Sequence, residues 1–324
     1  MKQFAVSIIA IAFATPHAIA QGTQGVTTYP VKPIRMIVSS GAGGGLDFVS
    51  RLVAAPMSES LGQSVVVDNR AGASGSIAAE LAALAPADGY TLMMLSASLV
   101  VYGVATKTRY DLYRDFAPVS QAAASPYILT VHPSLPVKSV KELIAYAKTN
   151  PAKLNYASTG NASLAHLATE LFALNAGVRM THVPYKGVGA ALTDLLSGQV
   201  QMSFLSGGSV AGQVRSGKLR AVAVASTQRT KIMPDVPTVI EAGMPGYAVT
   251  QWHGMLAPRD TPRAIIERLH REVVKAVAQP EVASRMAQDG TESVASSPEQ
   301  FAKFLANERA QWAKAAKSAN LSPL

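Results

Sequence analysis

The chain has 324 residues, a formal net charge of +9 and no cysteine. The lack of cysteine excludes disulfide bonds and thiolate chemistry, so an exported form of the chain needs a large apolar core to stay folded. Charged residues make up only 15% of the chain and the basic ones are scattered, which argues against a nucleic-acid-binding surface. The positive excess is either an ordinary solvated surface or a weak long-range attraction for anions.

The first twenty residues have the pattern of a secretory signal peptide. Lys2 precedes an apolar run over residues 4–14, and Ala18-Ile19-Ala20 offers the small-x-small cleavage site. The run is too short to span a bilayer, and no later stretch reaches about 18 uninterrupted apolar residues. We therefore predict export to the periplasm, cleavage after Ala20 and a soluble mature chain.

Short apolar strands and helical patterns alternate along the rest of the chain. Strands are expected at residues 34–39, 64–68, 91–95, 127–131, 154–157, 181–183, 201–204 and 221–225. Helices are expected at residues 46–61, 140–148, 163–175, 262–278 and 298–318, with another ending at Leu84. This alternation predicts an α/β fold with a mainly parallel sheet and helices on both faces.

Three loops rich in glycine and small hydroxyl side chains lie at residues 39–47, 69–76 and 158–163. Each follows a strand and precedes a helix, so each lies at the carboxyl end of its sheet, where open α/β folds bind ligands. Free N–H groups at a helix start attract anions. The first loop lacks dinucleotide spacing because Leu46 stands at the third glycine position, and no Walker A lysine follows. We expect the loops to face one another across a single cleft.

A series of ordered motifs from about Tyr29 to the C-terminus resembles the Bug family, the solute receptors of tripartite tricarboxylate transporters. The motifs are YPVKPIRMIV, GAGGGLD, VVVDNRAGASGS, PADGYTL, YASTGNASLAH, VPYKGVGAALTDLLSGQV, KLRAVAVAS and MPDVPTVIEAG. The resemblance implies a periplasmic binding protein of type II, with two α/β domains around a ligand cleft joined by two crossing strands. It implies no enzyme activity, no cofactor and no metal.

The domain boundaries that follow from this resemblance are discontinuous in sequence. We expect the first domain to comprise residues 21–124 and 248–324, and the second to comprise residues 125–247. The chain should cross between them near residues 122–127 and 247–252, and we expect a monomer.

The implied ligand is a small carboxylate, namely a dicarboxylate, a tricarboxylate, an aromatic carboxylate or an amino acid. The implied partner is the membrane permease of a tripartite transporter, and a ligand-sensing adaptor for a membrane signalling protein is the alternative. An exported serine hydrolase is less favoured, because the GGSVA segment misses the G-x-S-x-G elbow at its final residue and no base is positioned beside its serine.

Receptors of this family hold a carboxylate through backbone N–H groups and small hydroxyl side chains of the loops. This implies a ligand-binding set of Ser39, Ser40, Gly41, Ala42, Gly43, Gly44 and Asp47 in the first loop, Ser158, Thr159, Asn161, Ser163 and His166 in the second, and Ser206 and Gly207 after a later strand. Asp47 is favoured as a first-turn acid of its helix, and His166 as a polar residue of a helix face. The family usually has an aromatic residue and proline where this chain has Ser39-Ser40, which removes an aromatic wall and adds two hydroxyls.

Overall fold

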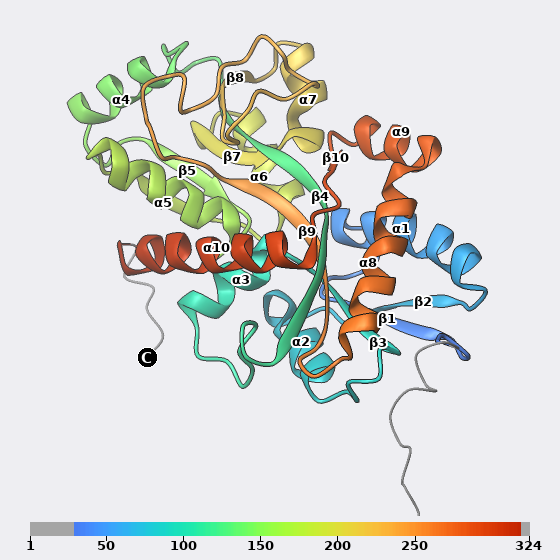
Figure 1. Ribbon diagram of the computed structural model, residues 1–324. Coiled ribbons are helices and arrows are strands. Elements are labelled where there is room, and N and C mark those ends of the chain that lie inside the picture. The colour runs from blue at the N-terminus through green and yellow to red at the C-terminus, as the bar shows by residue number, and fades with distance from the viewer. Residues whose placement is uncertain (1–28, 319–324) are drawn as a thin grey trace, which may run out of the picture.

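The computed structural model describes residues 29–318, so the predicted signal peptide and its cleavage site lie outside the described residues. Figure 1 shows two bodies of α/β structure joined by long strands, with one long helix lying across both. Within residues 29–318, no helix combines the length and the apolar character needed to cross a membrane.

The first sheet region has strands in the order β2, β1, β3, β9 and β4. β1 (Ile34–Val38) is parallel to β2 (Val65–Asn69) and β3 (Thr91–Ser96), whereas β9 (Thr250–Pro258) is antiparallel to β3 and to β4 (Phe116–Val131). The short β10 (Glu292–Ser293) pairs with β4. The helices of this region are α1 (Gly45–Leu61), α2 (Ser76–Ala83), α3 (Ala97–Ala105), α8 (Arg263–Ala278) and α9 (Pro280–Gln288).

The second sheet region is built on the last part of β4. This part is antiparallel to β7 (Met202–Ser206) and β8 (Arg220–Val224), and β5 (Asn155–Ser158) is parallel to β7 and to β6 (Thr181–Pro184). Its helices are α4 (Val140–Thr149), α5 (Leu164–Ala176), α6 (Val188–Leu196) and α7 (Gly207–Arg215).

β4 changes partners at one point along its length. Its pairing with β9 ends at the match of Pro126 with Thr250, and its pairing with β7 begins at the match of Tyr127 with Ser206. β4 and β9 therefore connect the two sheet regions side by side. The domain division expected from the sequence remains a prediction.

The last helix, α10 (Pro298–Ser318), packs against α3 of the first region and α5 of the second (Figure 1). Its buried side chains include Phe301, Leu305 and Trp312, which recur at the spacing that keeps one helical face toward the core. These side chains belong to the same apolar cluster as Trp252 of β9. α10 thus covers the crossing strands from one side.

The α/β class is confirmed, but the expected mainly parallel sheet is wrong. The two long central strands run antiparallel to their neighbours, because β9, which follows the whole second region in sequence, inserts between β3 and β4. The strand expected at residues 127–131 is only the last part of β4. The helices α3, α6, α7 and α9 were not expected; α3 is apolar on most sides and α7 is rich in glycine, so neither has a clear helical period.

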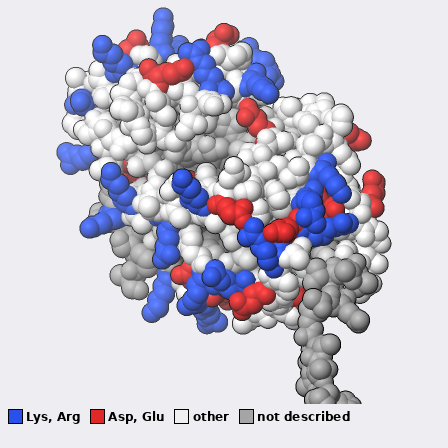
Figure 2. All heavy atoms as spheres, viewed as in Figure 1, with Lys and Arg blue, Asp and Glu red and all other residues white. Residues whose placement is uncertain are grey.

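The face of the molecule in Figure 2 carries both signs of charge. Lys and Arg side chains are spread over it and are interspersed with Asp and Glu. Ion pairs such as those of Arg263 with Glu267 and Glu299 account for part of this mixing. This face therefore lacks the continuous basic surface that nucleic-acid binding requires.

Candidate functional site

A cavity of about 320 Å³ lies between the two sheet regions. Elements of both regions line it, together with Ser125 and Tyr127 of the crossing strand β4. The first region contributes Gly45, Leu46, Ser98, Gln251, His253 and Asp289, and the second contributes Thr159, Gly187, Val188, Ser206, Gly208 and Ser209. A cavity at the junction of two α/β regions is the ordinary place for a small-molecule site.

Among the described residues, four helices begin at this cavity. α1 starts at Gly45, α3 has Ser98 in its first turn, α6 follows its N-cap residue Gly187, and α7 follows its N-cap residue Ser206. None of the four has an N-cap side chain that accepts a hydrogen bond from its first N–H groups. These N–H groups and the positive ends of the helix dipoles are therefore available to the oxygen atoms of an anion.

Lysine and arginine do not occur among the described residues that line the cavity. An anion held here would be bound by backbone N–H groups and hydroxyl side chains rather than by an ion pair. Ser206 and Ser209 are two such hydroxyl side chains. Their Oγ atoms lie 2.7 Å apart, and each hydroxyl can form a further hydrogen bond to a ligand.

The floor of the cavity is formed by the two crossing strands. Gln251 and His253 of β9 face it together with Ser125 and Tyr127 of β4. Within the described structure, Oε1 of Gln251 and Nδ1 of His253 are buried without a hydrogen-bond partner. Burial lowers the pKa of His253 to about 4, so its imidazole is neutral near pH 7. Buried polar atoms without partners are costly in a protein interior, and two of them facing one cavity are consistent with a site that a ligand completes.

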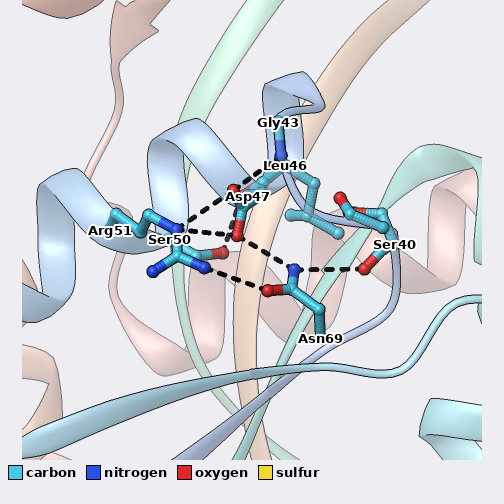
Figure 3. Close-up of polar contacts among 8 residues, drawn as sticks. Ser40, Gly43, Leu46, Asp47, Ser50, Arg51 and Asn69 are labelled. Atoms are coloured by element: carbon cyan, nitrogen blue, oxygen red, sulfur yellow. Dashed lines mark hydrogen bonds and ion pairs between the residues drawn. The ribbon is translucent and has the colours of Figure 1, made fainter.

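The first glycine loop is braced by Asp47, as Figure 3 shows. Oδ2 of Asp47 accepts a hydrogen bond from the N–H of Gly43 at 2.9 Å, and its Oδ1 accepts from Asn69 Nδ2 at 2.9 Å and from Arg51 Nε at 3.0 Å. Burial alone would raise the pKa of Asp47, but the hydrogen bonds from Arg51, Gly43 and Asn69 hold it below its ordinary value. Asp47 thus fixes the loop that leads into α1, in keeping with the first-turn role favoured from the sequence.

The second loop is also tied together internally. Oγ of Ser163 accepts a hydrogen bond from the N–H of His166 and caps α5, and Nδ1 of His166 accepts from the N–H of Ala162. Oγ of Ser158 lies 2.6 Å from Nε2 of His182. The rings of His166 and His182 stack with centroids 3.7 Å apart, and burial, followed by the neighbouring His182, lowers the pKa of His166 to about 4.

The structure brings only part of the predicted site set to the cavity. Thr159 and Ser206 line it, and Gly207 lies beside the lining residue Gly208. The remaining predicted residues are not among those that line it: Ser39, Ser40, Gly41, Ala42, Gly43, Gly44, Asp47, Ser158, Asn161, Ser163 and His166. At the first loop the lining begins at Gly45, directly after the predicted residues. Their role in binding stays a prediction.

The sequence-based reasoning missed several residues that line the cavity. Gln251 and His253 lie in a segment expected only to cross between domains, where an alternating pattern around Trp252 was the available signal. The sequence around Asp289 and around Ser98 contains no recognisable binding motif. Among residues 29–318 there is also no cluster of three or more His, Asp or Glu side chains arranged to hold a metal ion.

A second hollow, of about 490 Å³, lies between α1 and α9 and is larger than the cavity. Charged side chains of both signs line it, including Arg51, Glu59, Glu281 and Arg285. It lies on the first sheet region, and no described residue of the second region lines it. The smaller cavity between the regions is therefore the better candidate for ligand binding.

The sequence and the structure match known receptors over most of their length. Residues 49–321 match the family described as tripartite tricarboxylate transporter family receptor. The protein BugT of Bordetella pertussis is 38% identical over 289 residues, which cover 88% of this chain and 89% of BugT.

Two solved structures from Rhodopseudomonas palustris superimpose closely on this chain. Rpa4515, solved with adipate, is 36% identical with a TM-score of 0.77, covering 91% of this chain and 100% of that one. MatC, solved with bound malate, is 32% identical with a TM-score of 0.75, covering 89% of this chain and 100% of that one. The Bug resemblance and the periplasmic-binding-protein fold are thereby confirmed. The chain belongs to the tripartite tricarboxylate transporter receptor family, whose members are periplasmic solute receptors and not enzymes.

Proposed function

We propose that this protein binds a small carboxylate in the cavity between its two sheet regions and delivers it to the membrane subunits of a tripartite transporter. The observation that carries the proposal is the convergence of four uncapped helix starts on a cavity without lysine or arginine among its described lining residues. The adipate and malate of the two related structures support the same ligand class.

The strength of binding requires contributions from both sheet regions. A micromolar receptor needs about −8 kcal/mol, whereas one helix start contributes about 0.3–1 kcal/mol to an exposed anion and up to about 2 when the anion is partly buried. Several hydrogen bonds to a charged group, each about 1.5–3 kcal/mol, supply the difference only when water is largely excluded. We therefore infer that the two regions close on the ligand, with β4 and β9 absorbing the rotation.

The mature chain can be tested by thermal unfolding and titration calorimetry against matched pairs of small carboxylates and their amides. A carboxylate at a hundred times its dissociation constant should stabilise the native state by about 2.7 kcal/mol, and the amide should not. A chelator should leave the affinity unchanged, because backbone donors and hydroxyls hold the ligand. Equal binding of acid and amide would contradict the proposal, as would loss of binding on chelation.

The proposed role also requires that the protein is exported and that it binds a membrane partner. The family is periplasmic, and we infer that the signal peptide is cleaved after Ala20, which intact-mass measurement of the exported protein tests. Co-purification of the ligand-loaded receptor with the permease subunits tests delivery. Co-purification with a membrane signalling protein instead would favour the sensing alternative.

A further inference from the structure

Among the described residues that line the cavity, Asp289 is the one with an acidic side chain. Asp289 follows directly after α9 and belongs to the first sheet region, but it faces α7 of the second. Its backbone is held in place, because a Cβ atom added at Gly208 would collide with the Asp289 carbonyl oxygen. A Cβ atom added at Gly290 would likewise lie 3.0 Å from the N atom of Gly208. Two glycines thus allow the end of α9 to pack on the start of α7, which fixes where Asp289 lies.

Asp289 is exposed to solvent, and within the described structure its carboxylate has one weak hydrogen bond and no cation to balance its charge. Its Oδ2 lies 3.5 Å from Oγ1 of Thr291, at the limit of a hydrogen bond, and that hydroxyl also lies 2.7 Å from Oγ of Ser125. Among the described residues it forms no ion pair with Lys, Arg or His. Burial raises the pKa of Asp289, with the Thr291 hydrogen bond opposing this effect. The cavity therefore contains a negative charge that no cation of the described structure neutralises.

The floor adds further groups that can accept a hydrogen bond. Nδ1 of His253 is without a partner in the described structure, and the His253 residue is only 3% exposed. Oε1 of Gln251, also buried and unpartnered, is an acceptor. The Gln251 atom comes from a different element than Asp289 and independently calls for a hydrogen-bond donor on the ligand, and His253 Nδ1 accepts as well in the tautomer that carries its proton on Nε2.

The cavity thus offers hydrogen-bond donors on one side and hydrogen-bond acceptors on another. The starts of α1, α6 and α7 offer N–H donors that suit a carboxylate. Asp289 and the β9 side chains offer acceptors and one negative charge, which suit a protonated amine. A second carboxylate placed near Asp289 would instead meet a like charge.

We propose that the ligand is an amino carboxylate whose ammonium group is bound by Asp289, with Gln251 and His253 beside it. This inference rests on the proposed function, since the helix starts must hold the carboxylate of the same molecule. Asp289 is then the residue that selects an amino acid over the hydroxy acid and the unsubstituted acid with the same carbon skeleton.

The test uses three sets of probes, each with the same skeleton and a different substituent. They are alanine, lactate and propionate; aspartate, malate and succinate; and phenylalanine, phenyllactate and phenylpropionate. Calorimetry on the mature protein should give the tightest binding to the amino member of whichever set fits the cavity. An ion-paired hydrogen bond corresponds to a preference of about tenfold to a hundredfold over the unsubstituted acid.

The variant Asp289→Asn should abolish that preference while leaving the unsubstituted acid bound at least as well as before. Asp260→Asn is the matched control, because Asp260 is exposed in the turn after β9 and undergoes the same change of charge. It should retain the wild-type preference.

The possible failures are distinguishable. If carboxylates bind but the unsubstituted or hydroxy member is preferred, and Asp289→Asn changes nothing, the role of Asp289 is overturned and the proposed function stands. If no member of any set binds better than its amide, the proposed function fails and this inference fails with it.

Discussion

The two faces of strand β9 differ sharply although their residues are neighbours in sequence. Trp252 points toward α10, where its Nε1 donates to Glu308 Oε2 at 2.7 Å and Trp312 Nε1 donates to the same oxygen at 2.9 Å. The ring of Trp252 meets Phe301 and Phe304 edge-on. Gln251 and His253 point the other way, into the cavity, and each has a buried atom without a partner in the described structure.

The difference follows from the geometry of a strand, in which successive side chains alternate between faces. One face of β9 is packed and hydrogen-bonded, so it holds the crossing strand against α10. The other face keeps unpaired polar atoms, each of which costs about 1–3 kcal/mol when buried. A strand that joins two regions can thus be rigid on one side and ready for a ligand on the other.

Replacing single residues on the two faces should separate stability from binding. We expect Trp252→Ala to lower the free energy of unfolding by about 3–5 kcal/mol, because it removes a large buried side chain and leaves Glu308 with one fewer donor. Gln251→Ala, one residue away, should change it by less than about 1 kcal/mol. Urea unfolding of the ligand-free protein measures both values.

Comparable losses in the two variants would contradict this contrast. They would mean that the cavity face of β9 contributes to packing as much as the α10 face does. The ligand affinity of Gln251→Ala should fall in either case, because the floor loses an acceptor.

Local patterns predicted most single elements of the fold, but they could not predict how distant elements pair. α1, expected at residues 46–61, runs over Gly45–Leu61, and α10 runs over Pro298–Ser318 as expected. Both have an apolar period that local sequence shows directly. The insertion of β9 between β3 and β4 depends on partners more than a hundred residues away, and no local period encodes it.

The predicted site residues and the lining of the cavity overlap only in part, at Thr159 and Ser206, and their role in binding stays a prediction. The first loop was expected to bind through Ser39 to Gly44, whereas the cavity lining starts at Gly45. The hydrogen bonds of Asp47 with Gly43 and Asn69 hold the earlier part of the loop, and a contact with a side chain 22 residues away cannot be read from glycine spacing. His253 and Asp289 line the same cavity although they are far apart in sequence, and only the folded chain brings them there.

Acid titration should sharpen the comparison, because burial shifts the pKa of one group beside each face of β9, His253 on the cavity side and Glu308 of α10 on the other. Burial lowers the pKa of His253 to about 4, whereas the ordinary value of histidine is about 6.5. Its neutral form therefore contributes stability above pH 6.5 that is lost as the pH falls toward 4, and by pH 5 the loss should reach about 2 kcal/mol. Burial raises the pKa of Glu308, against the opposing hydrogen bonds of Trp252 and Trp312, so its contribution is lost in the other direction, as the pH rises.

Unfolding free energies at pH 5 and pH 7.5 test these opposite signs. When the pH falls from 7.5 to 5, the variant His253→Gln should lose less stability than the wild type. When the pH rises from 5 to 7.5, the variant Glu308→Gln should lose less stability than the wild type. Each variant is the control for the other. Parallel shifts in both would show that neither buried group titrates as its surroundings require.

The smallest expected effect concerns the contact that closes the cavity beside Asp289. Gly208 and Gly212 both lie in α7, but a Cβ atom at Gly208 would collide with the Asp289 carbonyl, whereas nothing lies within 4 Å of one at Gly212. Gly212→Ala should stabilise the protein by about 0.5–1 kcal/mol through the helix preference of alanine. Gly208→Ala gains the same preference but must push α7 and the end of α9 apart, so we expect a net loss of about 1 kcal/mol.

Because this contact joins the two sheet regions, Gly208→Ala should also weaken ligand binding, and Gly212→Ala should not. Equal stability and equal affinity in the two variants would mean that α7 and α9 do not touch in the ligand-bound protein, and that the regions close on the ligand elsewhere.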